Sequence, residues 1–265
     1  MLKRTVLYFL NLFERPFHPG EEVAERYKVV SHLGMGSYGH SYLVIDSLNK
    51  QRKVLKALRL HKRLTQAGRN GFELEKELLR SIDHRGFPTY FEAGLHKNIP
   101  FYTMEYIEGK NFEQLIFAEG RKITETEAFR IADVLLTYIE YLHDKNIIHR
   151  DIRIPNVIYD GSKIRLIDLG LGRHFEHPEG PHFVKEVDLR REINRQADFY
   201  GLGHFLLFLL YSNFSFDTNE KEKSWDEELT ISNNAKQIIK RLLQIDAPYE
   251  CCSQIRSDIK SLTVN

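Results

Sequence analysis

The chain has 265 residues, a formal net charge of +1 at pH 7 and 42% hydrophobic residues. This length suits one enzyme unit whose core is large enough to need no covalent cross-links. The near-neutral charge gives no general attraction to nucleic acid, so we expect no nucleic-acid partner. The only two cysteines, Cys251 and Cys252, are adjacent. Neighbouring cysteines rarely bridge, which indicates a reducing, cytoplasmic compartment.

Residues 1–26 are expected to form an extension before the main domain. Within it, residues 1–13 mix Lys3 and Arg4 with many large apolar side chains. We expect a helix docked on the body of the protein, and contact with a membrane surface or a partner protein is the alternative. No small-residue cleavage site follows, so a signal peptide is not predicted. The longest apolar run, residues 200–211, is too short to span a membrane.

The next segment carries three glycines, Gly34, Gly36 and Gly39, in the spacing G-x-G-x-x-G. Residues 27–30 and 41–45 predict strands on both sides of this loop. A dinucleotide site would need a helix after the third glycine. The pattern therefore predicts a strand–loop–strand hairpin rather than a dinucleotide site, and an ordinary glycine hairpin would also satisfy it.

Residues 53–56 predict a strand in which Val54 and Lys56 share one face and Lys53 points the other way. The basic stretch 59–63 is expected to be a solvated linker. Apolar residues at helical spacing then predict a helix around residues 72–82, which carries Glu75. Two other glutamates of this helix, at 73 and 77, lie about 200° around it from Glu75 and are expected to face solvent.

Residues 101–109 predict a strand, read as an edge strand, that ends at a glycine turn. Residues 124–127 read Thr-Glu-Thr-Glu, a capping box that opens a long helix. The apolar residues of that helix recur at helical spacing, so we assign it to the core rather than to a site.

The most informative segment contains His149-Arg150-Asp151, then Asn156, and finally Asp168-Leu169-Gly170. Phosphoryl transfer needs a group that orients the attacking hydroxyl, together with ligands for magnesium. Carboxylate and amide oxygens are hard ligands that suit this ion. Asp and Asn are also common in ordinary turns. However, this motif is long, and the other parts of such a site occur in order along the chain.

These motifs, in this order, resemble the protein kinase family, specifically its small, soluble, bacterial-like serine/threonine members, from about Tyr27 to the C-terminus. The resemblance implies an α+β, bilobal fold for residues 27–265. A β-rich lobe with one main helix would take residues 27–104, a hinge 105–109, and a larger helical lobe 110–265. It also implies ATP and Mg²⁺ as cofactors and proteins with Ser or Thr hydroxyls as substrates.

The resemblance assigns a role to each motif. Asp151 would orient the hydroxyl as catalytic base, Asn156 and Asp168 would hold the metal, and Lys56, paired with Glu75, would hold the α- and β-phosphates. Asp198, which opens a buried helix, would brace the catalytic loop. Met104 would line the back of the adenine pocket, and the backbone of Glu105 and Ile107 would bond the base. The residues expected to bind the nucleotide are Leu33, Gly34, Gly36, Gly39, Ser41, Val54, Lys56, Met104, Glu105 and Ile107.

Three positions depart from the family pattern. Ser41 stands where the family usually has a Val that packs on adenine, and Leu169 replaces a Phe. Arg153 occupies the place, two residues after the catalytic Asp, where serine/threonine members carry a Lys that steadies the γ-phosphate. Its position favours serine/threonine specificity, and Arg keeps the charge but brings a planar fork. We therefore count Arg153 among the catalytic residues.

The segment after Asp168 is unusual because it contains no Ser, Thr or Tyr as far as Glu186. Family members commonly order this segment by phosphorylation. We expect ordering without it, with Glu176, Glu179 or Glu186 near Arg150. The family's A-P-E motif is not recognisable, and the substrate-docking region after residue 212 looks reduced. A small-molecule kinase and a pseudokinase scaffold therefore remain as alternatives to a serine/threonine protein kinase.

Overall fold

The computed structural model describes residues 17–175, 189–214 and 223–262. It divides into two compact units. The first comprises residues up to Ile107 together with Leu169–Leu171, and the second comprises Glu108–Asp168 and the residues from Gly172 onward. The change from one unit to the other falls after Ile107, inside the stretch predicted as a hinge.

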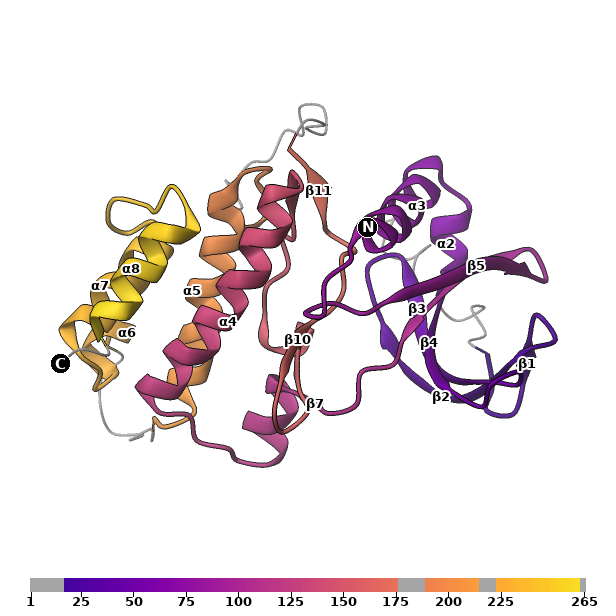
Figure 1. Cartoon of the computed structure of the whole chain (residues 1–265), viewed down its shortest axis with the longest axis horizontal. Coiled ribbons are helices and arrows are strands. Elements are labelled where there is room, and N and C mark those ends of the chain that lie inside the picture. Colours follow the sequence, from indigo (N-terminus) through magenta and orange to yellow (C-terminus); the bar gives the residue numbers. More distant parts are fainter. Residues whose placement is uncertain (1–16, 176–188, 215–222, 263–265) are drawn as a thin grey trace. The chain divides into compact units, whose positions relative to one another are not determined.

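The first unit is a six-stranded antiparallel sheet in the order β1-β2-β3-β4-β6-β5, with helix α3 lying along it (Figure 1). Strand β6 lies between β4 and β5, so the prediction of an edge strand there is wrong, and β5 takes the edge. The elements are β1 (Glu22–Val23), β2 (Tyr27–Met35), β3 (Gly39–Asp46), β4 (Arg52–Leu58), α2 (Leu60–Arg63), α3 (Gln66–Ser81), β5 (Tyr90–His96) and β6 (Ile99–Glu105).

Two stretches of this unit differ from expectation. Residues 17–26, assigned to the extension, join the sheet: β1 pairs with β2, and Phe17 donates its N–H to the Tyr42 hydroxyl at 3.1 Å. Residues 1–16, including the predicted N-terminal helix, lie outside the described residues. The basic stretch 59–63 is not a solvated linker, because it forms the short helix α2 and Arg59 is buried.

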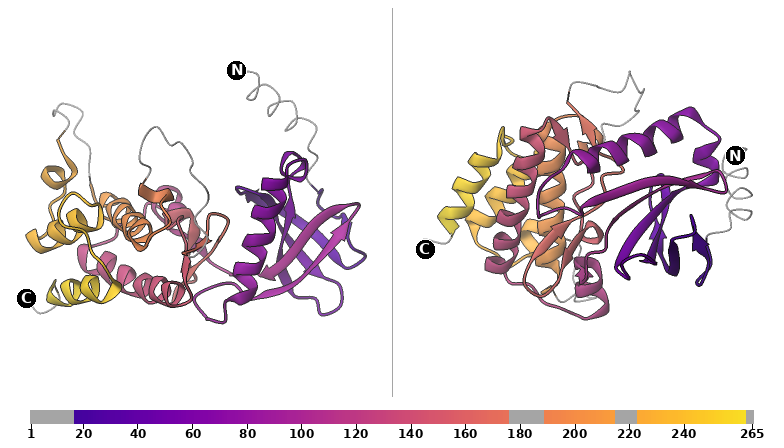
Figure 2. Two further views of the ribbon diagram at one scale, coloured as in Figure 1. Left: turned by 90° about the horizontal axis from the view of Figure 1, so that it is seen from above. Right: turned by 45° about the vertical axis from the view of Figure 1, so that its right-hand side comes forward.

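The second unit is mainly helical (Figure 2). Helix α4 (Glu125–Asp144) begins as predicted at Thr124, whose hydroxyl accepts the Glu127 N–H at 3.3 Å. The unit also contains the strands β7 (Lys110–Asn111), β8 (Ile147–Ile148), β9 (Val157–Tyr159), β10 (Ile164–Leu166) and β11 (Arg173–His174), the helices α5 (Arg195–Tyr211), α6 (Trp225–Glu228), α7 (Asn233–Leu242) and α8 (Cys252–Leu262), a π-helix (Gln114–Ala118) and two 3-10 turns (Ile154–Asn156, Leu189–Arg191). Among all described helices, none has the length and apolarity needed to cross a bilayer.

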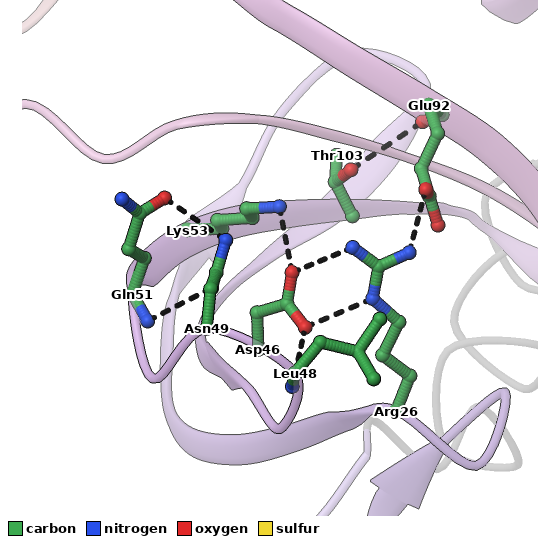
Figure 3. Close-up of polar contacts among 8 residues, drawn as sticks. All are labelled: Arg26, Asp46, Leu48, Asn49, Gln51, Lys53, Glu92 and Thr103. Carbon is green, nitrogen blue, oxygen red and sulfur yellow. Dashed lines mark hydrogen bonds and ion pairs between the residues drawn. The ribbon is translucent and has the colours of Figure 1, made fainter.

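A buried ion cluster ties the ends of β2, β3 and β4 together (Figure 3). Asp46 is fully buried and receives both arms of Arg26, Nε at 2.8 Å and Nη2 at 2.7 Å. Lys53 Nζ, also buried, lies 2.8 Å from the same carboxylate. Arg26 also reaches Glu92 of β5 at 2.7 Å. The hydrogen bond from Arg26 holds the pKa of Asp46 well below its usual range.

Replacing Asp46 with Asn should destabilise the sheet unit, because Lys53 would stay buried without its carboxylate. We expect the free energy of unfolding at pH 7 to fall by about 3 kcal/mol. A lowered carboxyl pKa contributes stability above the unfolded value and loses it as pH falls towards the folded value. The difference between wild type and Asp46→Asn should therefore shrink below about pH 4 in urea denaturation.

The control for this measurement is Glu92→Gln. It removes the second carboxylate that Arg26 contacts, and the Glu92 side chain is 43% exposed. That variant should cost less than about 1 kcal/mol. Equal losses in the two variants, or a difference that does not change with pH, would contradict the interpretation.

Candidate active site

One face of the sheet gathers the side chains predicted to bind nucleotide. Residues paired across antiparallel strands point to the same face. The register pairs Lys56 with Ser41 on one side and Tyr102 on the other. The neighbouring row pairs Val54 with Leu43 and Met104. Ser41, Val54, Lys56 and Met104 therefore share one face, while Lys53 points to the opposite face, as the strand alternation predicted.

Lys56 and Glu75 form the predicted ion pair, and both side chains are only 3% exposed. The Tyr102 hydroxyl donates a further hydrogen bond of 2.9 Å to the same carboxylate oxygen. Glu73 and Glu77 are exposed, as the helical spacing predicted. A buried ammonium needs such a partner, because removing a charge from water costs several kcal/mol. The pair thus fixes helix α3 to strand β4.

The glycine-rich loop joins β2 to β3, and its backbone closes with a 2.9 Å bond from Gly36 N–H to the Gly39 carbonyl. Gly39 lies directly against β4: a Cβ built there would stand 2.9 Å from both the Lys56 Cγ and the Ala57 oxygen. A side chain at position 39 would therefore require both Lys56 and the backbone of β4 to shift. Leu33, near the end of β2, is an exposed apolar side chain, at 47% exposure.

The end of β6 limits how the backbone can meet a base. The Glu105 N–H donates to the Thr89 carbonyl at 2.8 Å, so Glu105 can offer only its own carbonyl to a ligand. Ile107 is buried, at 8% exposure. The sequence analysis assigned both residues a backbone role without distinguishing donor from acceptor, and the structure makes that distinction for Glu105.

In the second unit, two of the residues predicted to form the site, Asn156 and Arg153, contact Asp151. Asn156 Nδ2 donates to the Asp151 carboxylate at 2.8 Å and to its backbone carbonyl at 2.9 Å. Arg153 Nε lies 2.9 Å from the other carboxylate oxygen. Because the amide nitrogen makes these bonds, Oδ1 is the atom of Asn156 that could coordinate a metal. Asp151 is thus held between an amide and a guanidinium.

The carboxylate of Asp198 holds the backbone of the loop that carries Asp151, as predicted. It is fully buried at the start of α5. Its Oδ1 accepts the Arg150 N–H at 2.7 Å, and its Oδ2 accepts the His149 N–H at 3.0 Å. His143 of α4 lies 2.9 Å from Oδ2 through Nε2. One carboxylate therefore organises the backbone directly before Asp151.

Asp168 is tied to the same loop through the backbone, because the Ile167 N–H donates to the Asn156 carbonyl at 2.9 Å. Two residues here adopt the left-handed conformation that favours glycine: Arg150 (φ 63°) and Asp168 (φ 66°). Such strained positions persist only where the surrounding structure enforces them, and they cluster at functional sites.

The residues present fit ATP and magnesium in chemical type. One unit supplies a buried cation on a sheet face beside a glycine loop, which suits phosphate groups. The other supplies an amide oxygen and a carboxylate close along the backbone, which are the hard donors that Mg²⁺ takes.

Comparison with known proteins agrees with this chemistry: residues 27–263 match the family defined as the protein kinase domain. The chain belongs to the protein kinase family. The crystal structure of the Mycobacterium tuberculosis PknI kinase domain superposes with a TM-score of 0.70, covering 93% of this chain and 99% of that one, at 19% identity. That likeness shows the predicted α+β kinase fold.

Two bacterial kinases of Bacillus subtilis (strain 168) are similar in sequence. The probable serine/threonine-protein kinase YbdM is 38% identical over 248 residues, which are 94% of this chain and 93% of YbdM. The serine/threonine-protein kinase PrkC is 26% identical over 209 residues, which are 75% of this chain but 32% of PrkC. This kinase chain therefore spans nearly the whole of YbdM and about a third of PrkC.

Sequence reasoning missed two residues that support the site. Tyr102 could have been found, because it lies two residues before Met104 and strand alternation puts both on one face. His143 carried no such signal in a helix assigned to the core. Several predictions fall outside the described residues: the roles of Glu176, Glu179 and Glu186, the A-P-E region, and residues 215–222 of the region after residue 212.

Replacing Asp198 with Ala should disable the catalytic loop of this kinase, because two backbone N–H groups and His143 would lose their acceptor. We expect the free energy of unfolding to fall by about 3 kcal/mol and the phosphorylation rate by roughly tenfold or more. Asp144→Ala, which changes an exposed Asp at the end of α4, is the control. If both variants phosphorylate at wild-type rate at a temperature where they stay folded, Asp198 is not a brace.

Proposed function

We propose that this chain is an ATP-dependent serine/threonine protein kinase that transfers the γ-phosphate of ATP to protein hydroxyls. The observation that carries the proposal is the arrangement at Asp151. Its carboxylate is held by Asn156 at 2.8 Å and by Arg153 at 2.9 Å. This fixes a base beside a residue that can ligate metal and a cation that can meet the transferred group.

Each group has one task in this proposal. Asp151 accepts the proton of the substrate hydroxyl. At the same time the hydroxyl oxygen bonds to the γ-phosphorus, and the bond from that phosphorus to the departing ADP breaks. Arg153 balances the negative charge of the transferred group. Lys56, fixed by Glu75, holds the phosphates that remain on ADP. When bound, Mg²⁺ neutralises phosphate charge, and Asn156 and Asp168 are the residues that would hold it.

The adenosine end of ATP would meet the face of the sheet unit described above. Val54 and Met104 offer apolar surface for the base, with Leu33 and Ser41 at the glycine-rich hairpin. The backbone of Gly34, Gly36 and Gly39 would cover the phosphates. The Glu105 carbonyl would accept from the base and the Ile107 N–H would donate to it, since the Glu105 N–H is already used.

The choice of hydroxyl rests on two supports. The cation two residues after Asp151 is Arg153, at the position of the lysine in serine/threonine members of the family. The two Bacillus subtilis proteins similar to this chain are both named as serine/threonine kinases. We extend that specificity to this chain, with protein substrates. A cytoplasmic location is part of the proposal and rests on two cysteines that form no disulfide.

The test is transfer of labelled phosphate from ATP, with magnesium, to a Ser- and Thr-rich protein acceptor. Wild type and the control Asp144→Asn should label the acceptor on Ser or Thr. Asp151→Asn should lower the rate about a hundredfold or more, because the base is lost, and Asp168→Asn should do the same through metal binding.

Each other outcome points to a different function. Nucleotide binding with transfer only to a small metabolite would make the chain a small-molecule kinase. Binding of no nucleotide would make it a scaffold. Labelling that survives in both Asp variants would show that the assigned residues are wrong.

A further inference from the structure

The tip of the glycine-rich loop contacts helix α3 through Tyr38, the residue before β3. A Cβ built on Gly71 of α3 would stand 2.2 Å from Cε1 and 2.3 Å from Cζ of Tyr38. These distances are far shorter than any van der Waals contact. The ring therefore occupies the space that a side chain at position 71 would need, and the contact requires glycine there.

Two further contacts hold Tyr38 in place. Its carbonyl accepts the Arg59 N–H at 3.0 Å. Lys62 Nζ lies 5.2 Å from the ring centroid, within the range of a cation–π interaction. Helix α2, which carries Lys62, packs closely on α3, because a Cβ on Gly68 would stand 2.4 Å from the Lys62 carbonyl oxygen. The loop tip is thus fastened to both helices.

This contact lies one helical turn from the Lys56–Glu75 ion pair, since Gly71 precedes Glu75 by four residues. The loop also returns to the ion pair from its other side: Gly39, next to Tyr38, lies against Lys56. The contacts therefore form a closed ring. Tyr38 contacts Gly71, helix α3 joins Gly71 to Glu75, Glu75 pairs with Lys56, and Lys56 packs against Gly39, the neighbour of Tyr38. Movement at any one point changes the constraints on the others.

We propose that Tyr38 is a positioning residue whose ring, seated over Gly71, couples the glycine-rich hairpin to the Lys56–Glu75 pair. The inference rests on the proposed kinase function, because it concerns how these groups receive ATP. With the ring in place, the hairpin and the lysine are held together before nucleotide arrives. Coupling is reciprocal, so bound nucleotide strengthens the contact as much as the contact strengthens binding.

Four variants isolate the contact: Gly71→Ala, Tyr38→Ala, their double variant, and Tyr38→Phe, which keeps the ring. Gly71→Ala expels a side chain that sits at a loop tip, so the protein should still fold. The Kd and KM for Mg·ATP should rise roughly three- to tenfold in either single Ala variant. The KM for the protein acceptor should not change, and Tyr38→Phe should behave like wild type.

The double variant decides whether the two residues act through one contact. If they do, its Kd for Mg·ATP should match the single variants rather than multiply their effects. Independent, additive effects would overturn the proposal. Asn70→Ala is the matched control, because it changes an exposed neighbour in the same helix and should leave the Kd unchanged.

A stability measurement tests the contact without any nucleotide. Ala is favoured over Gly inside helices. In the Tyr38→Ala background, where the space is open, Gly71→Ala should therefore raise the unfolding midpoint. In the wild-type background the gain should be absent, because the new methyl collides with the ring. Equal gains in both backgrounds would show that Tyr38 does not occupy this site.

The two measurements separate the inference from the function on which it rests. If wild type binds no Mg·ATP, the kinase proposal fails and the coupling role fails with it, while the stability cycle still reports the contact. If wild type binds Mg·ATP but the variants bind it equally well, only the positioning role fails.

Discussion

Strand β4 carries two buried lysines on opposite faces, and the rest of the sheet unit is arranged around their neutralisation. A buried ammonium without a carboxylate is strongly unfavourable. Lys53 therefore pairs with Asp46, which also binds Arg26. This ion cluster joins the ends of three strands on the core side of the sheet. Lys56 takes Glu75, which brings helix α3 onto the other face. The same physical requirement thus joins the strands on one side and fixes helix α3 to the sheet on the other.

In the helical unit a single carboxylate has the corresponding role. Asp198 accepts two consecutive backbone N–H groups, from His149 and Arg150, which orients the turn that presents Asp151. The left-handed conformation of Arg150 is held by these bonds, so the energetic cost of the strained turn is offset in the core. Asn156 then links Asp151 to the segment of Asp168 through its side chain and its carbonyl. Both units therefore place reactive groups on short segments anchored by buried charge.

Much of this arrangement is predictable from sequence because it follows from periodicity. Strand alternation separated Lys53 from Lys56. The family resemblance selected Glu75, and helical spacing placed Glu73 and Glu77 on a different side of the helix. Local rules could not show which residues distant in sequence would meet. The Tyr102–Glu75 bond spans 27 positions and the His143–Asp198 contact spans 55. Arg59 was misassigned for the same reason, because its N–H bonds to the carbonyl of Tyr38, a residue distant in sequence.

The two faces of β4 also determine where the gene can gain or lose codons. The turn between β3 and β4, residues 47–51, lies at the surface and could lengthen without altering either face. A single-residue insertion or deletion between Lys53 and Lys56 would place both side chains on the same face of β4. One of the two lysines would then lose its carboxylate. Homologous sequences should accordingly vary in length at this turn while keeping the three-residue interval between the two lysines.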